Sequence, residues 1–151
     1  MSFNYPAAVR FRCIKCGICC GNTQEKVRHI LLMRKEAEQI SAATLQPISA
    51  FAVKVKDKAP YSYEMIKTAN KSECVFLKNN CCAIYSLRPL ICRFYPFELK
   101  TGENRKHEFR YTRECPGVGK GKVLRESDYE RLFQLAHVKA RAECRLNEEK
   151  G

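Results

Sequence analysis

Four cysteines lie within eight residues near the start of the chain, at Cys13, Cys16, Cys19 and Cys20. Three of them have the spacing C-x2-C-x2-C, which lets a loop fold back until successive sulfur atoms converge on one point. Cys20 departs from this spacing. Because adjacent side chains leave the backbone in different directions, we expect Cys19 and Cys20 to serve different centres. The segment therefore predicts a metal or cluster site that distant cysteines complete.

The chain contains ten cysteines in all. Their clustering favours metal ligands over disulfide bonds, which are the lesser alternative, and places the protein in a reducing compartment. No apolar run is long enough to cross a bilayer, and the first residues lack the charged and apolar regions of a signal peptide. We therefore expect a cytoplasmic protein that does not contact the membrane.

The formal net charge of +12 raises the question of a nucleic-acid partner. The basic residues are scattered along the chain, however, and eight thiolates around two dications or two clusters would lower the charge to roughly +8. We therefore expect no nucleic-acid binding, and instead a protein partner or a redox partner.

Hydrophobic periodicity predicts several short strands and two helices that would position the cysteines. Strands are expected over residues 8–12, 27–32, 61–66 and 107–112, and a hairpin over 74–85 that turns at Asn79 and Asn80. Residues 53–56 are expected to form either a brief strand or an exposed arm. Helical segments are expected over residues 34–43, just after Pro47, and from a capping box that begins at Ser127. Residues 85–88 are expected to form a turn, and the glycine-rich segment 116–121 a flexible loop.

An apolar stripe follows the last predicted helix at Tyr129, Leu132, Phe133, Ala136, Ala140 and Cys144, and we expect Cys144 to be buried in it. The fold class is therefore α+β: a small metal-centred domain with short strands and irregular loops around the cysteine ligands, plus a C-terminal helix. Residues 1–125 are expected to form the metal-binding part, 126–146 the helix packed on it, and 147–151 a frayed tail.

The cysteines stand among a specific set of neighbours. The motif Cys13-x2-Cys16-Gly17-x-Cys19-Cys20 is followed by Cys74-x-Phe76-Leu77, then by Cys82-x-Ile84-Tyr85-x2-Arg88-Pro89-x2-Cys92-Arg93-x-Tyr95-Pro96. Taken together, these motifs resemble the YkgJ-type CxxCxxCC cysteine-cluster family over about residues 10–120. That family is described as a zinc- or iron-chelating domain and includes relatives of flagellin lysine N-methylase.

The resemblance implies a set of eight metal ligands: Cys13, Cys16, Cys19, Cys20, Cys74, Cys82, Cys92 and Cys115. Cys81 and Cys144 lie outside the family positions. Since four thiolates commonly bind one zinc ion or one iron–sulfur cluster, eight ligands indicate two sites. The spacing leaves their division open. Our assignment gives Cys13, Cys16 and Cys19 to one site and Cys20 to the other, with the four later cysteines divided between them.

The third cysteine at the same interval is typical of the ferredoxin run rather than of a zinc ribbon. We therefore expect iron–sulfur clusters of the [4Fe-4S] type, with a role in electron transfer or in assisting a partner enzyme. A zinc-binding structural or interaction module is the alternative. A part in protein lysine methylation is a second alternative, implied by the resemblance alone, and the residues do not decide whether the chain is an enzyme.

The residues expected around the cluster include Arg88 and Arg93, which would balance its charge or meet an acidic partner, and Tyr95. With Tyr95, the aromatic residues Phe76, Tyr85, Phe94 and Phe97 would shield a cluster from solvent, and such shielding helps to set its reduction potential.

Overall fold

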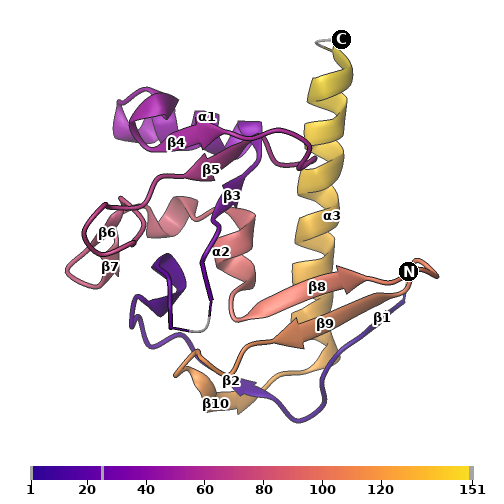
Figure 1. The fold of residues 1–151 in the computed structure, drawn as a ribbon. Helices are drawn as coiled ribbons and strands as arrows, with labels where there is room; N and C mark the ends of the chain where they lie inside the picture. Colours follow the sequence, from indigo (N-terminus) through magenta and orange to yellow (C-terminus); the bar gives the residue numbers. More distant parts are fainter. Residues whose placement is uncertain (1, 25, 150–151) are drawn as a thin grey trace.

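The longest element is helix α3 (Glu126–Glu149), which lies along one side of the molecule (Figure 1). The computed structural model describes residues 2–24 and 26–149. The remaining helices are short: α1 (Arg34–Thr44), α2 (Leu90–Phe94) and three 3-10 helices at Ile18–Cys20, Ile48–Ala50 and Tyr85–Leu87. With the small sheets described next, they confirm the predicted α+β class.

Ten short strands form four small sheets in the described part of the chain. One sheet has the order β1 (Phe3–Asn4), β9 (His107–Tyr111), β8 (Phe97–Thr101), and another the order β3 (Leu31–Leu32), β5 (Tyr63–Met65), β4 (Ala52–Lys54). Strand β2 (Arg10–Phe11) pairs with β10 (Val118–Val123), and β6 (Leu77–Lys78) pairs with β7 (Cys81–Cys82). Among the strand pairs of the described residues, only that of β1 with β9 is parallel.

The predicted hairpin and its turn at Asn79 and Asn80 are confirmed, and the structure adds the register. Asn79 and Asn80 both adopt positive φ, at 52° and 60°, which is the geometry of a two-residue turn with the twist of the flanking strands. Leu77 pairs with Cys82, and Lys78 pairs with Cys81. The turn therefore sets where the two hairpin cysteines lie.

The glycine-rich segment was predicted to be a flexible loop, but residues 118–123 form strand β10. Gly117 lies so close to β2 that a Cβ atom there would be 2.3 Å from the carbonyl oxygen of Arg12. Gly121 also approaches β2 and has a φ of +82°, which favours glycine. The glycines thus permit close pairing of two backbones, and the pairing joins the segment before Cys13 to the segment after Cys115.

The last helix begins at Glu126 rather than at the predicted cap Ser127. The carboxylate of Asp128 accepts a hydrogen bond of 2.8 Å from the backbone N–H of Arg125, so the cap lies two residues earlier than predicted. Cys144, expected inside the apolar stripe, is exposed, and its neighbour Glu143 is buried at 1% exposure. Glu143 faces inward because its carboxylate accepts hydrogen bonds from the first N–H groups of α1.

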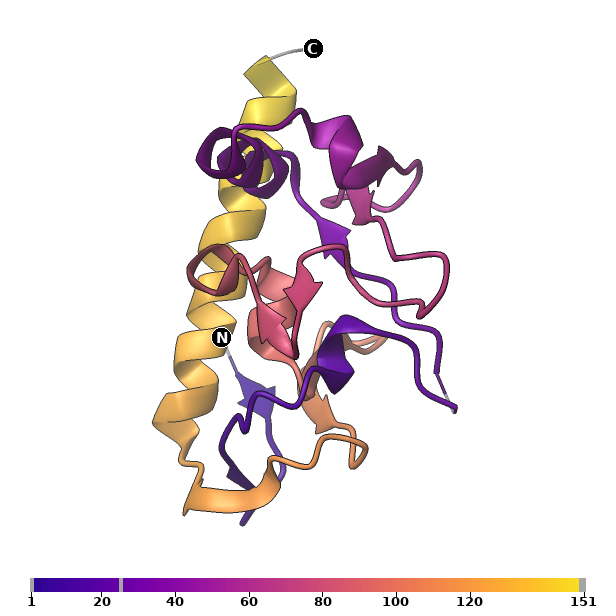
Figure 2. The same ribbon diagram turned by 90° about the vertical axis from the view of Figure 1, so that its left-hand side faces the viewer.

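The interior has two hydrophobic cores. The first contains Cys20 and Cys74 with Leu32, Ile40 and Phe51, and several partly buried cysteines pack against it. The second is aromatic and lies between the β8–β9 sheet and α3, with Phe94, Phe97, Phe109, Tyr129 and Phe133 at its centre. Figure 2 shows α3 flanking the molecule along its height. Five thiols, those of Cys19, Cys20, Cys74, Cys82 and Cys92, thus lie in or against the first core, and the C-terminal helix closes the second.

Among the described residues, none of the helices combines the length and the apolar character that a membrane span requires.

Candidate metal centre

The N-terminal cysteine segment turns tightly around Gly17. This residue has a φ of +81° and precedes the 3-10 helix Ile18–Cys20, in which the N–H of Cys20 donates to the carbonyl of Gly17. A helical turn changes where adjacent side chains point, and the Sγ atoms of Cys19 and Cys20 come within 4.0 Å of each other. The two thiols therefore do not diverge as expected, whereas the expectation that they serve different centres stays a prediction.

A cavity of about 210 Å³ lies beside this turn, and we call it the thiol cavity. Its other walls come from the β6–β7 hairpin and from the segment that leads into α2. In both ribbon views the segment that carries Cys19 lies beside the hairpin (Figures 1 and 2). The cysteines that line the cavity are Cys13, Cys19, Cys20, Cys74, Cys81, Cys82 and Cys92.

Backbone contacts bring these distant cysteines together. The N–H of Cys74 donates to the carbonyl of Cys20 at 2.6 Å. This backbone bond holds the two residues next to each other, and both of their side chains are buried. The position of Cys82 is set by the hairpin register, which pairs it with Leu77. Cys92 lies in the first turn of α2, where its N–H donates to the carbonyl of Pro89. Six family cysteines, 13, 19, 20, 74, 82 and 92, thus line one cavity, and five of them, all but Cys13, come from the 3-10 turn and the segments that follow it in the chain.

Cys13, Cys16 and Cys115 form a second group that overlaps the first at Cys13. Burial is the main cause that raises the pKa of the Cys115 thiol, and the nearby thiols of Cys16 and Cys13 raise it further. The β2–β10 pairing holds them there, because the N–H of Arg12 donates to the carbonyl of Gly117 at 3.1 Å. Cys13 also lines the thiol cavity, so the two groups adjoin.

Burial and mutual repulsion shape the acidity of the thiols. Burial raises the pKa of Cys74 and Cys82, and raises that of Cys92 to about 12. In the adjacent pair, a hydrogen bond from Cys20 lowers the pKa of Cys19, and the same contact raises that of Cys20. Because cysteine binds metal as the thiolate, metal binding at this cavity must release protons from the thiols.

Arg28 joins two of the cysteine segments, and sequence inspection did not single it out. Its Nε donates to the carbonyl of Cys19 at 2.9 Å, its Nη2 lies 3.5 Å from the carbonyl of Ile91, and its guanidinium lies over the Tyr95 ring. Those carbonyls immediately precede Cys20 and Cys92. Arg28 also contributes positive charge that lowers the pKa of Cys19, although hydrogen bonding from Cys20 is the larger cause. Nothing in its local sequence signals this role, since both partners are distant backbone atoms.

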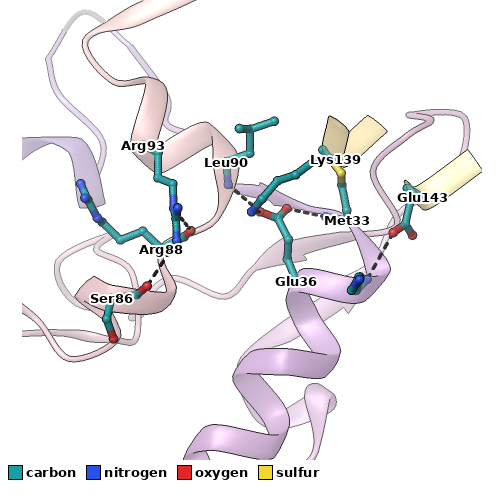
Figure 3. A network of polar contacts seen from close by, with 9 residues as sticks. Met33, Glu36, Ser86, Arg88, Leu90, Arg93, Lys139 and Glu143 are labelled. Carbon is teal, nitrogen blue, oxygen red and sulfur yellow. Dashed lines mark hydrogen bonds and ion pairs between the residues drawn. The ribbon is translucent and has the colours of Figure 1, made fainter. Parts of the chain in front are cut away.

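The residues predicted to surround a cluster occupy three different places. Arg88 lines the thiol cavity, with its guanidinium 3.8 Å from the centre of the Tyr85 ring. Arg93 instead donates to the carbonyls of Arg88 and Ser86, which braces the turn before α2 (Figure 3). Tyr95 lines a neighbouring, larger cavity. The structure therefore brings Arg88 to the thiols directly and places Arg93 as a support for its backbone.

The expected aromatic shield is divided between the two cores. Phe76 packs in the core that contains the thiols, and Tyr85 lines the thiol cavity. Phe94 and Phe97 lie in the second core against α3. Aliphatic residues, among them Ile30, Leu77 and Ile84, form much of the apolar wall instead.

A buried carboxylate holds the helix that carries Cys92 (Figure 3). Glu36, only 6% exposed, accepts from the N–H groups of Met33 at 3.0 Å and Leu90 at 2.6 Å, and from the Lys139 ammonium at 3.1 Å. It therefore connects the start of α1, the start of α2 and the side of α3. A sequence signal existed for this residue, because Glu36 lies one helical turn from the apolar Ile40 on the inner face of α1.

The thiols surround a cavity and do not converge on a point. Across residues 2–24 and 26–149, no three cysteine, histidine or carboxylate side chains already meet in a geometry suited to a single metal ion. The donor chemistry is nevertheless that of a metal site, because clustered buried cysteines with cationic neighbours match soft metal centres. The fold and the site thus define a cysteine-rich metal-binding α+β domain.

Comparison with known proteins places the chain in a family. Residues 12–116 match the CxxCxxCC family, whose description is "Putative zinc- or iron-chelating domain", and the chain belongs to this family. It is also similar to uncharacterized protein MJ0661 of Methanocaldococcus jannaschii, with 28% identity over 139 residues, covering 87% of this chain and 70% of the relative. No solved structure matches the chain. The predicted family is therefore confirmed, and with it the general assignment to metal binding.

Proposed function

We propose that the thiol cavity holds an iron–sulfur cluster of the [4Fe-4S] type, ligated by four of the five thiols Cys19, Cys20, Cys74, Cys82 and Cys92. The observation that carries the proposal is that these thiols surround a cavity of about 210 Å³ rather than one point. A single zinc ion draws its four sulfurs to about 2.3 Å, whereas a cluster places several inorganic atoms between them. A cavity walled by thiols is the arrangement that the larger group needs.

The remaining ligands support a second centre. Cys13, Cys16 and Cys115 supply three thiols, and one thiol is left over from the neighbouring five. Two four-thiolate centres would account for all eight family positions. The shared border of the two groups, where Cys13 reaches the thiol cavity, favours centres that lie next to each other.

A bound cluster would supply one-electron transfer. The residues of this chain would tune it: the apolar wall limits access of water, and the cations Arg28 and Arg88 favour the thiolate form of Cys19. The cavity mouth carries Lys15, over the half-exposed ring of Tyr85. This cationic edge suits an acidic redox partner protein in the cytoplasm.

The test is anaerobic purification followed by iron, acid-labile sulfide and zinc analysis, with visible absorption and electron paramagnetic resonance. We expect a coloured protein with about equal iron and sulfide. A colourless protein that contains stoichiometric zinc and no sulfide, after both anaerobic purification and attempted cluster reconstitution, would contradict the cluster.

A zinc-stabilised module is the second candidate, and one contact favours it. The 4.0 Å between the Sγ atoms of Cys19 and Cys20 is close to the edge of a zinc–sulfur tetrahedron, about 3.8 Å for bonds of about 2.3 Å. This candidate predicts a colourless protein that unfolds when a chelator removes the metal.

A further inference from the structure

A second, larger cavity lies next to the thiol cavity, and the metal sites leave it without a role. Its volume is about 740 Å³, within the range of small-molecule binding sites. Its walls come from parts of the segments 18–23 and 26–31, from helix α2, from strands β8 and β9, and from Ala136 of α3, and we call it the α2–β9 cavity. Arg28 connects the two cavities. Its side chain lines the α2–β9 cavity and donates to the carbonyl of Cys19, a residue that lines the thiol cavity. It also contacts the carbonyl of Ile91, which precedes Cys92.

The apolar part of the wall would accept a hydrocarbon or aromatic body. It comprises Leu31, Leu90, Phe94, Phe97, Leu99 and Tyr111. Most of these side chains belong to the aromatic core or pack against it, so the wall is fixed by the fold.

The charged part of the wall is predominantly cationic. Four cations, Lys26, Arg28, Lys58 and Arg110, line the cavity with two carboxylates, those of Glu98 and Glu114, and His29, which also lines it, pairs with Glu64. The carboxylates are already engaged, Glu114 by the hydroxyl of Thr23 at 2.9 and 3.0 Å and Glu98 by Lys100 at 3.1 Å. Arg110 is likewise held by Glu108. The hydroxyl of Thr23 is neutral and leaves the charge of Glu114 in place, so Lys26, Arg28 and Lys58 oppose one carboxylate and the wall keeps an excess of positive charge.

Arg28 has hydrogen-bonding capacity to spare. A guanidinium carries five N–H donors, and in the described part of the chain Arg28 uses one from Nε and one from Nη2, both on backbone carbonyls. No carboxylate of the described residues forms an ion pair with it. The side chain is half-buried and held in place by its two carbonyl contacts and by the Tyr95 ring. A fixed, partly desolvated guanidinium with free donors is suited to an oxyanion.

We propose that the α2–β9 cavity binds a small organic oxyanion, with its carboxylate or phosphate on Arg28 and its apolar body against Phe94, Phe97 and Tyr111. The charge excess favours an anion over a neutral molecule or a cation. The volume and the apolar wall favour an organic molecule over an inorganic ion. This inference does not depend on which metal the thiols hold.

Calorimetry on the metal-loaded protein provides the test, with benzoate, phenyl phosphate, benzamide and inorganic phosphate as probes. We expect benzoate or phenyl phosphate to bind at least tenfold more tightly than benzamide, which lacks the charge, and than inorganic phosphate, which lacks the apolar body. The comparison of the first two probes distinguishes a carboxylate ligand from a phosphate ester. Equal binding of benzamide and benzoate, or no heat from either organic anion at millimolar concentration, would overturn the proposal.

Two variants and a control locate the binding. Arg28→Gln should weaken the preferred anion at least tenfold, whereas Arg10→Gln, which removes an arginine bonded to the carbonyl of Gly121 outside the cavity, should not. Because Arg28 also supports cysteine segments, Ala136→Phe is the second variant: it fills the cavity from α3 and leaves the contacts of Arg28 intact. It should abolish anion binding with unchanged metal content. Anion binding that survives Ala136→Phe would refute the site, and metal loss alone would bear on the thiol centres instead.

Discussion

The Sγ atoms of Cys19 and Cys20 lie 4.0 Å apart on one side of a 3-10 turn. The turn places both thiols with Cys74, Cys82 and Cys92, while Cys13 and Cys16 lie near Cys115. The doubled cysteine therefore lies in the wall of one cavity, and we propose that the division between the two centres falls between Cys16 and Cys19, with Cys13 at their shared border.

Serine substitutions should reveal that boundary. We expect Cys20→Ser and Cys74→Ser to remove the same centre, and Cys115→Ser to remove the other, because each variant deprives only its own group of a buried thiolate. Metal and sulfide analysis of each purified variant measures this. Cys144→Ser is the control, since that thiol is exposed and outside both groups, and it should retain all metal. Loss of both centres in every variant would contradict the division.

Replacing the buried carboxylate should weaken the whole fold. Glu36→Gln keeps the shape but leaves the Lys139 ammonium without its ion-pair partner, so we expect a loss of about 3 kcal/mol in the free energy of unfolding. Chemical denaturation of the metal-loaded protein measures the change. Glu38→Gln on the same helix is the matched control, because its side chain is 52% exposed beside Arg34, and a surface pair contributes less than about 1 kcal/mol. Equal effects of the two substitutions would show that the Glu36 network is not a stabilising link.

Gly117→Ala should open the contact that joins the two ends of the metal-binding segment. The added methyl group would lie 2.3 Å from the Arg12 carbonyl oxygen, and we expect a destabilisation of about 2 kcal/mol. Thermal unfolding checks it. Gly102→Ala serves for comparison, since its nearest neighbour would be 3.7 Å away, and that change should stay within about 0.5 kcal/mol. A Gly117→Ala protein as stable as Gly102→Ala would mean that β2 and β10 can separate without cost.

The metal-free protein should lose stability in alkali. Burial raises the pKa of Cys92 from 9.0 to about 12 in the folded state, so the unfolded chain ionises first. The stability that the neutral Cys92 thiol contributes to the folded state is fully present below pH 9 and is lost as the pH rises through 12. Denaturation of the apo-protein at several pH values measures the slope, to which one thiol contributes at most about 1.4 kcal/mol per pH unit.

The control for this pH effect is Cys92→Ser, which should flatten the slope between those values. The metal-bound protein should respond in the opposite sense and release metal as the pH falls, because protons compete for the thiolates. Identical alkaline slopes for the apo-protein and its Cys92→Ser variant would contradict the assignment to this thiol.

Local chemistry in the sequence determined several features of this protein. The Asn79–Asn80 turn and helix α1 were predicted because turn residues and apolar periodicity act over a few neighbours. The cysteine motifs identified the family, since their residue types and spacings are themselves the signal.

Only the tertiary structure decided how the thiols group and what surrounds them. The carbonyl contacts of Arg28 and the capping of α1 by Glu143 depend on partners that are distant in the sequence. The 3-10 turn that brings Cys19 to Cys20 is local, but its distance from the other thiols is set by long-range contacts such as the bond from the N–H of Cys74 to the carbonyl of Cys20. Strand β10 was missed because its glycines lower strand propensity, and close pairing with β2 outweighs that preference. Long-range backbone pairing, which leaves no periodic trace in the sequence, thus arranged the cysteines that the sequence had already identified.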